Sequence, residues 1–152
     1  MIKLTYNSPL GQLLIIAEDE HITGLYFAET EIISNETSAV IDACIKELDA
    51  YFAGKLKNFT VPIKLTGTDF RMKVWKALMT IPYGKTISYM ELAKLIGQPT
   101  AIRAVGGANH HNPISIIVPC HRVIGANGSL TGYGGGVSNK EFLLNLERQS
   151  HA

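Results

Sequence analysis

The run Ile114-Ser115-Ile116-Ile117-Val118-Pro119-Cys120-His121-Arg122-Val123 places a cysteine directly after an apolar segment. The apolar residues predict a short buried strand or extended segment, and Pro119 ends any strand pairing. Cys120 is therefore expected at the mouth of the core. His121 and Arg122 add positive charge and hydrogen-bond donors, which favour a reactive thiolate. On these residues alone, Cys120 as one more buried hydrophobic side chain remains an alternative.

The composition is that of a soluble globular protein, with 152 residues, 46% hydrophobic and 18% charged. No apolar stretch reaches membrane-spanning length, and residues 1–6 lack the apolar core of a signal peptide. We therefore expect a cytoplasmic protein without a membrane partner. Cys44 and Cys120 are expected to be free thiols, and two distant cysteines make no structural metal site.

Charge is distributed unevenly along the chain. Residues 1–66 contain five Lys or Arg and nine Asp or Glu, a net −4, whereas residues 67–152 contain nine and four, a net +5. Four of the five histidines also lie in the second part. This pattern weakly indicates a polyanionic partner for residues 67–152, although ordinary fluctuation could produce it.

The first third of the chain predicts a small sheet and one helix. Strands are expected at residues 2–6, 11–17 and 22–27, most simply as an antiparallel meander. An amphipathic helix follows from Thr37 or Ser38 to Phe52, with Gly54 as its C-terminal stop. Cys44 falls on its apolar face, which favours a packing role. Residues 55–67 are an extended connection, with a domain boundary near Thr66.

The next part predicts a helix-turn-helix. Thr68 is a plausible cap for a helix over residues 69–80, and Ser88 with Glu91 forms a capping box for another. Gly97 ends that helix, and Pro99 suits the first turn of the next. This last helix is rich in small residues with Arg103 as its long side chain, so it could approach a nucleic-acid backbone closely but not read a sequence. Tight packing between helices is an equal explanation of its glycines.

The last part predicts a glycine-rich loop and a helix. Residues 125–136 are rich in glycine around Tyr133 and match no phosphate-binding loop, which suits the rim of a pocket for a flat group. An amphipathic helix is expected from Ser138 or Asn139 to Arg148. Its expected core face is Phe142, Leu143 and Leu146, with Glu147 beside it.

From residue 68 to 147 the chain resembles the O6-alkylguanine-DNA alkyltransferases, also called methylated-DNA–protein-cysteine methyltransferases. The resemblance rests on the stretches 118–123, 103–108 with Asn112-Pro113, 133–136 with Lys140-Glu141 and Glu147, and 81–89. It implies an α+β fold with an RNase H-like lobe of sheet and helix over residues 1–66. Residues 67–152 would form a mainly helical, winged-helix-like domain that binds DNA and accepts the alkyl group.

The resemblance also implies the chemistry. Cys120 would accept the alkyl group of O6-methylguanine in one irreversible turnover, with O4-methylthymine as a second candidate substrate. His121, oriented by Glu147, would be the general base through a water molecule. Tyr89 would donate a proton or hydrogen bond to the flipped base as it leaves. Asn112 would hold the turn that supports the site.

The remaining implied residues contact DNA or the base. Arg103 would enter the duplex as a finger and fill the vacated stack, on a surface of small residues made by Ala104, Gly106 and Gly107. The base pocket would be lined by Tyr133, Gly134 and Val123. Some relatives have serine at the position of Gly134, so a hydroxyl contact there is missing in this chain.

The residues themselves agree with this reaction. A base inside a duplex must be extruded before a side chain can reach it in line, and a wedge residue offsets that cost. No motif for a nucleotide, S-adenosylmethionine or a metal is present, so we expect no cofactor. The expected partner is double-stranded DNA containing alkylated guanine, bound by a monomer.

Three other interpretations remain as alternatives. A Cys120–His121 dyad could serve a cysteine hydrolase, although dyad partners are normally distant in sequence. A DNA-binding regulator without catalysis would not need the thiol. A metal site at His110, His111 and His121 is the weakest alternative, because neighbouring histidines do not easily share one ion.

Overall fold

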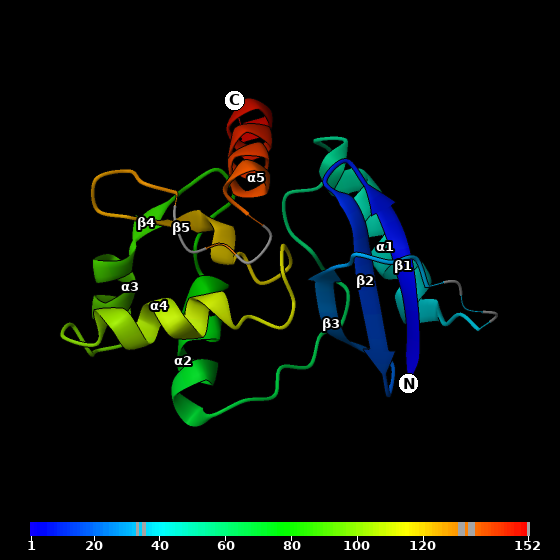
Figure 1. The fold of residues 1–152 in the computed structure, drawn as a ribbon, viewed down its shortest axis with the longest axis horizontal. Coiled ribbons are helices and arrows are strands. Elements are labelled where there is room, and N and C mark those ends of the chain that lie inside the picture. Colours follow the sequence, from blue (N-terminus) through cyan, green and yellow to red (C-terminus); the bar gives the residue numbers. More distant parts are fainter. Residues whose placement is uncertain (33, 35, 131–132, 134–135, 152) are drawn as a thin grey trace. The chain divides into compact units, whose positions relative to one another are not determined.

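The computed structural model describes residues 1–152 except 33, 35, 131, 132, 134, 135 and 152. The chain forms two compact units (Figure 1). The first comprises Met1–Leu65 and Pro113–Ile117, and the second comprises Thr66–Asn112 and Val118–Ala152. Helices and a small antiparallel sheet are both present, so the predicted α+β class is confirmed. Within the described part of the chain, no helix combines the length and apolarity needed to cross a bilayer.

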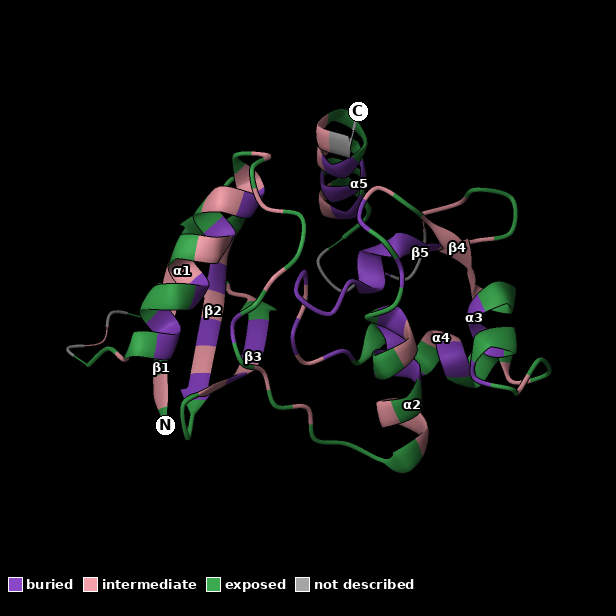
Figure 2. Cartoon of the chain, turned by 180° about the vertical axis from the view of Figure 1, so that it is seen from behind, coloured by how far each residue is buried: buried purple, intermediate pink, exposed green. Residues whose placement is uncertain are grey.

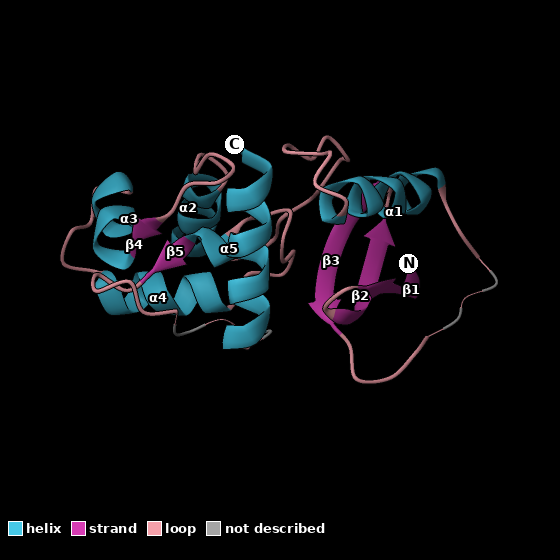
Figure 3. Cartoon of the chain, turned by 90° about the horizontal axis from the view of Figure 1, so that it is seen from above, coloured by secondary structure: helices cyan, strands magenta, loops and turns pink. Residues whose placement is uncertain are grey.

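The first unit contains the predicted three-stranded meander. Its strands are β1 (Ile2–Ser8), β2 (Gly11–Glu18) and β3 (His21–Phe27), paired antiparallel in that order. The tight turn between β2 and β3 places Asp19 and Glu20 at positive φ. Along β2 every second side chain is buried, from Leu13 to Ala17, because this face of the sheet lies under a helix (Figure 3).

Helix α1 (Ala39–Phe52) covers that face of the sheet (Figure 3). The Ser38 hydroxyl caps it by accepting a hydrogen bond from the Ile41 amide at 3.2 Å. Gly54 follows the helix with φ +74°, the left-handed conformation that glycine adopts most easily. Cys44 is fully buried on the inner side, and burial together with Glu47 raises its pKa to about 12. The second thiol is therefore a packing residue.

The predicted strand at residues 114–118 is wrong. Only Ile114 pairs, as a single parallel bridge to Leu25 on the edge of β3, with Ser115 N donating to Leu25 O at 3.1 Å. The chain then turns, with Ile117 N donating to Ser115 O at 2.8 Å and Ile116 at φ +72°. The apolar run is buried, as predicted, but it turns inside the core instead of pairing. Periodicity cannot distinguish these two arrangements for so short a segment.

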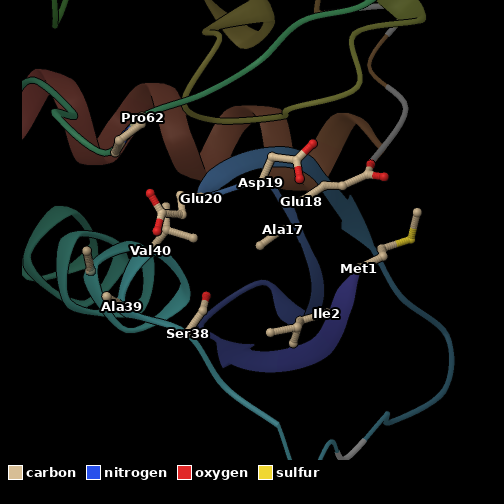
Figure 4. A pocket seen from close by; sticks show the side chains of 11 residues that line it. Met1, Ile2, Ala17, Glu18, Asp19, Glu20, Ser38, Ala39, Val40 and Pro62 are labelled. Atoms are coloured by element: carbon tan, nitrogen blue, oxygen red, sulfur yellow. The ribbon is translucent and has the colours of Figure 1, made fainter.

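A hollow of about 500 Å³ opens in the first unit at one end of the sheet (Figure 4). Its floor includes Ile2, Ala17 and Val40, and the three carboxylates of residues 18–20 lie along its rim. No cysteine or histidine lines it. This hollow is therefore not the site that the sequence predicts around Cys120.

The second unit is mainly helical. Its elements are α2 (Asp69–Leu78), β4 (Ile87–Ser88), α3 (Tyr89–Leu95), α4 (Ile102–His110), a 3₁₀ turn (Cys120–Arg122), β5 (Val123–Ile124) and α5 (Val137–His151). Thr68 caps α2, and the predicted capping box of Ser88 and Glu91 begins α3. The α2, α3 and α4 helices pack together around buried Val74, Trp75 and Leu92 (Figures 1 and 2).

Two predicted helix positions need correction. Helix α4 begins at Ile102 instead of near Pro99, because the Ala101 amide bonds to Gln98 O at 3.0 Å and closes a turn first. Helix α5 begins at Val137, and Phe142, predicted in its core face, is exposed. The buried face consists of Lys140, Leu143, Leu144 and Glu147, an i, i+3, i+4, i+7 stripe that contains two charged residues.

The short parallel pair of β4 and β5 was not predicted. Ile87 pairs with Val123 and Ser88 with Ile124. Because β4 directly precedes Tyr89 and β5 directly follows Arg122, this pair brings the start of α3 beside the Cys120 turn. Two segments more than thirty residues apart in sequence thus meet at one place.

Candidate active site and DNA-binding helix

Cys120 begins the 3₁₀ turn and is 5% exposed. Its amide donates to Val118 O at 2.8 Å, and the Asn112 side chain donates to the same carbonyl at 2.7 Å. Burial raises the pKa of the Cys120 thiol, while a hydrogen bond from Asn112 and the charge of Lys140 oppose this. The thiol therefore needs a base to become a nucleophile at neutral pH.

Two sequence-based expectations about Cys120 are wrong. The residue is buried instead of lying at the mouth of the core. The cation that acts on the thiol is Lys140 of α5, whereas the adjacent Arg122 side chain binds Glu147. The reason is geometric, since successive side chains of a 3₁₀ turn point about 120° apart.

A buried ionic group lies directly after Cys120. His121 Nε2 donates to Glu147 Oε2 at 2.6 Å, and both side chains are almost inaccessible to solvent. Burial lowers the pKa of His121 against the opposing effect of Glu147, so the imidazole is neutral. With its proton on Nε2, the ring presents Nδ1 as an acceptor, and this atom bonds to no described residue. A neutral imidazole in this tautomer can accept a proton at Nδ1.

Arg122 holds Glu147 from the other side. Its Nε donates to Oε1 at 2.8 Å and its Nη2 to Oε2 at 3.1 Å, while Nη1 donates to Ile81 O at 2.7 Å. Burial alone would raise the pKa of Glu147, but the contacts of His121 and Arg122 lower it to about 2. The carboxylate therefore stays charged and orients the imidazole.

Tyr89 is the first residue of α3 and is half-buried. Burial and the charge of Cys120 raise its pKa, and a hydrogen bond with Asn109 opposes them. Lys140 Nζ lies 6.0 Å from the centre of the ring. The phenol is thus protonated at neutral pH and close to the thiol, as a proton donor must be.

The pocket residues were predicted as Tyr133, Gly134 and Val123. Val123 is fully buried, and its carbonyl accepts a hydrogen bond from Lys140 Nζ at 2.6 Å. Tyr133 is also buried, and burial with the charges of Cys120 and Glu147 raises the pKa of its phenol well above the usual value. Gly134 lies outside the described residues.

The predicted DNA-contacting residues lie on α4, and three of the four are on its exposed side. Arg103, Ala104 and Gly107 are exposed and Gly106 is half-buried. No atom lies within 4 Å of the position that a Cβ on Gly107 would occupy. At these positions the helix presents small residues beside one long cationic side chain, Arg103.

Three residues of the site were missed or misread in the sequence. Arg122 was assigned to the thiol, Lys140 received no role, and Asn109 was not singled out. The spacing of Lys140 and Glu147 carried a signal, because residues seven apart share a helix face with the apolar positions between them. Nothing in the sequence marked Asn109. Among the described residues no group of three or more His, Cys, Asp or Glu side chains could hold a metal.

Two family models together match almost the whole chain. The 6-O-methylguanine DNA methyltransferase DNA-binding domain matches residues 69–149, and the ribonuclease-like domain of the same family matches residues 1–65. The chain belongs to the 6-O-methylguanine DNA methyltransferase family. The predicted family is thereby confirmed.

Individual members of the family are similar over nearly their full length. A methylated-DNA–protein-cysteine methyltransferase of Mycobacterium tuberculosis is 52% identical over 149 residues, covering 95% of this chain and 90% of that one. The constitutive enzyme of Bacillus subtilis is 45% identical, covering 97% and 95%. The crystal structure of Mycobacterium tuberculosis OGT in complex with DNA gives a TM-score of 0.87 at 51% identity, covering 96% and 92%.

Proposed function

We propose that this protein repairs DNA by moving the alkyl group of O6-methylguanine to its own Cys120, in one irreversible turnover. The observation that carries the proposal is the arrangement at residue 121. A neutral, buried imidazole follows the thiol directly, its Nε2 fixed by Glu147 and its Nδ1 available as a base. Family membership supplies the reaction class, DNA repair by alkyl transfer to a protein cysteine.

The reaction follows from the positions of these groups. The Cys120 proton passes through a water molecule to His121 Nδ1, and Sγ attacks the alkyl carbon opposite O6. The C–O6 bond breaks with its electron pair moving to the guanine, and Tyr89 gives its proton to the departing base. His121 then returns the thiol proton to Tyr89, so the net products are an S-alkylcysteine and guanine. No described side chain offers a chemistry for removing the thioether.

We further propose that the substrate is double-stranded DNA and that the target base leaves the stack. Arg103, exposed on α4 beside Ala104 and Gly107, fills the gap. The net charge of +5 over residues 67–152 favours the approach of a phosphate backbone. O4-methylthymine, with an analogous alkyl oxygen, is a second proposed substrate. The protein is proposed to act as a monomer in the cytoplasm.

The test is the intact mass of the protein after mixing with a duplex carrying one O6-methylguanine. We expect a gain of one methyl group that saturates at one equivalent, maps to Cys120 by peptide analysis, and disappears in Cys120→Ser. Cys44→Ala is the matched control and should be methylated like the wild type, because Cys44 is buried in the other unit. DNA binding without a mass change would overturn the proposal in favour of a damage-binding protein. Repeated turnover of an ester by Cys120 would overturn it in favour of a hydrolase.

A further inference from the structure

Asn109 is a buried polar residue on the inner side of α4, and the mechanism above does not use it. Its side chain is 2% exposed. Nδ2 lies 3.3 Å from the carbonyl oxygen of Cys120 and donates to it, and the same side chain hydrogen-bonds Tyr89. Oδ1 has no partner among the described residues, so both contacts belong to the amide nitrogen. An amide nitrogen has two hydrogens, one for each contact.

We infer that Asn109 is a positioning residue that fixes the Tyr89 hydroxyl relative to Cys120 and orients the phenolic proton toward the departing base. The inference rests on the proposed function. It adds a link between the nucleophile and the proton donor that neither the family match nor the sequence assigns.

In the hydrogen bond between Asn109 and Tyr89, the amide nitrogen Nδ2 donates and the phenolic oxygen accepts. A phenolic oxygen that accepts a hydrogen bond from Nδ2 has its own hydrogen turned away from Asn109, the orientation in which the hydroxyl can donate to another group. The same N–H stabilises the negative charge that grows on the oxygen as the proton leaves. The contact with Asn109 accordingly opposes burial and Cys120, which raise the pKa of Tyr89.

Asn109 is well placed to hold this geometry because its backbone is fixed independently. Trp75 Nε1 donates to the carbonyl of the preceding residue, Ala108, at 2.9 Å, which ties α4 to α2. One turn earlier, the Tyr89 ring lies 4.0 Å from the position of a Cβ on Gly106. The ring therefore lies along α4 from Gly106 to Asn109, so a shift of the phenol would disturb contacts at both ends.

The test is a double-mutant cycle on methyl transfer from O6-methylguanine duplex DNA. Asn109→Leu keeps the approximate size and removes the N–H groups, and we expect the single-turnover rate to fall by about tenfold or more. In a Tyr89→Phe background the same change should have little further effect, because no phenolic proton is left to orient. Asn145→Leu, the same substitution at an exposed position of α5, should leave the rate unchanged.

A second readout separates positioning of Tyr89 from general damage to the site. Alkylation of Cys120 by iodoacetamide releases iodide, which needs no proton, so Asn109→Leu should react at close to the wild-type rate. If Asn109→Leu fails to fold, Asn109→Asp has nearly the same shape, lacks the N–H donors, and should show the same pattern. The inference would be overturned if Asn109→Leu slowed methyl transfer equally in the wild-type and Tyr89→Phe backgrounds. It would also be overturned if Asn109→Leu slowed the iodoacetamide reaction as much as methyl transfer. Absence of transfer by the wild type would instead overturn the proposed function, and the inference with it.

Discussion

His121 Nε2 lies 2.6 Å from Glu147 Oε2, and neither side chain is accessible to solvent. The hydrogen bond joins the turn Cys120–Arg122 to a helix that begins fifteen residues after the end of that turn. It decides the tautomer of the imidazole and leaves Nδ1 to accept a proton. In the proposed reaction, the carboxylate would also stabilise the imidazolium that forms when His121 takes up the thiol proton.

Glu147→Gln is expected to slow methyl transfer by roughly 10- to 100-fold, because the amide keeps the shape but removes the charge that stabilises the imidazolium. The measurement is the single-turnover rate at neutral pH, scored on the folded fraction. Glu141→Gln, on the exposed side of the same helix, is the control and should transfer normally. A wild-type rate in Glu147→Gln would show that Glu147 has no part in activating His121.

Arg122→Met is expected to lower the free energy of unfolding by about 3–5 kcal/mol, because it leaves the Glu147 carboxylate buried without its bidentate partner. Urea denaturation measures the change. Arg148→Met, at an exposed position, should cost less than about 0.5 kcal/mol. Adding Glu147→Gln to Arg122→Met should restore part of the loss. A double variant less stable than Arg122→Met would argue against an uncompensated charge.

Acid is expected to destabilise the protein through His121 and Glu147. Burial lowers the pKa of His121 below the ordinary histidine value of 6.5. As the pH falls below 6.5, His121 of the unfolded chain therefore binds a proton, whereas His121 of the folded protein does not. For Glu147, burial is outweighed by His121 and Arg122, and its pKa falls from 4.5 to about 2. The unfolded chain again binds the extra proton, so stability decreases as the pH falls through both ranges.

Urea midpoints measured from pH 7.5 to pH 3 check this dependence. The wild type should lose stability from about pH 6.5 downward, and Glu147→Gln should lose less than the wild type below pH 4.5. Constant stability between pH 7.5 and pH 5 would contradict a neutral His121 in the folded state.

Gly107→Ala is expected to raise stability by about 0.5–1 kcal/mol, since alanine favours a helix and no atom lies within 4 Å of the new Cβ. It should nevertheless weaken binding to duplex DNA, because the methyl group holds the outer side of α4 away from the backbone. Thermal melting and a binding titration at fixed salt measure the two effects. In Gly67→Ala the new Cβ would lie 2.7 Å from the Trp75 ring, so this control should lose stability without losing DNA affinity per folded molecule. If Gly107→Ala bound duplex DNA with unchanged affinity, the DNA would not lie against Gly107 of α4.

Local sequence rules predicted much of the fold. Helix caps at Ser38, Thr68 and Ser88 act within three residues, so they are readable from sequence, and all three are present. The meander of the first unit followed from the alternation of residues 2–6, the apolar run of residues 11–17 and the turn residues around them. The start of α4 and the conformation of residues 114–118 were predicted wrongly, because competing local structures of similar energy fit the same residues.

The sequence by itself determined the family and the short-range elements, and it marked Cys120 as the candidate nucleophile, because each is encoded within a few neighbouring residues. Only the tertiary structure decided which charged side chains contact which groups of the site. The parallel pairing of Ile87 with Val123 brings Tyr89 to the Cys120 turn, and the packing of α5 buries Lys140 and Glu147 beside it. Arg122 is therefore bound to Glu147 instead of the adjacent thiol, and Asn109 meets both Cys120 and Tyr89. Contacts between residues distant along the chain depend on how the elements pack, which no local pattern specifies.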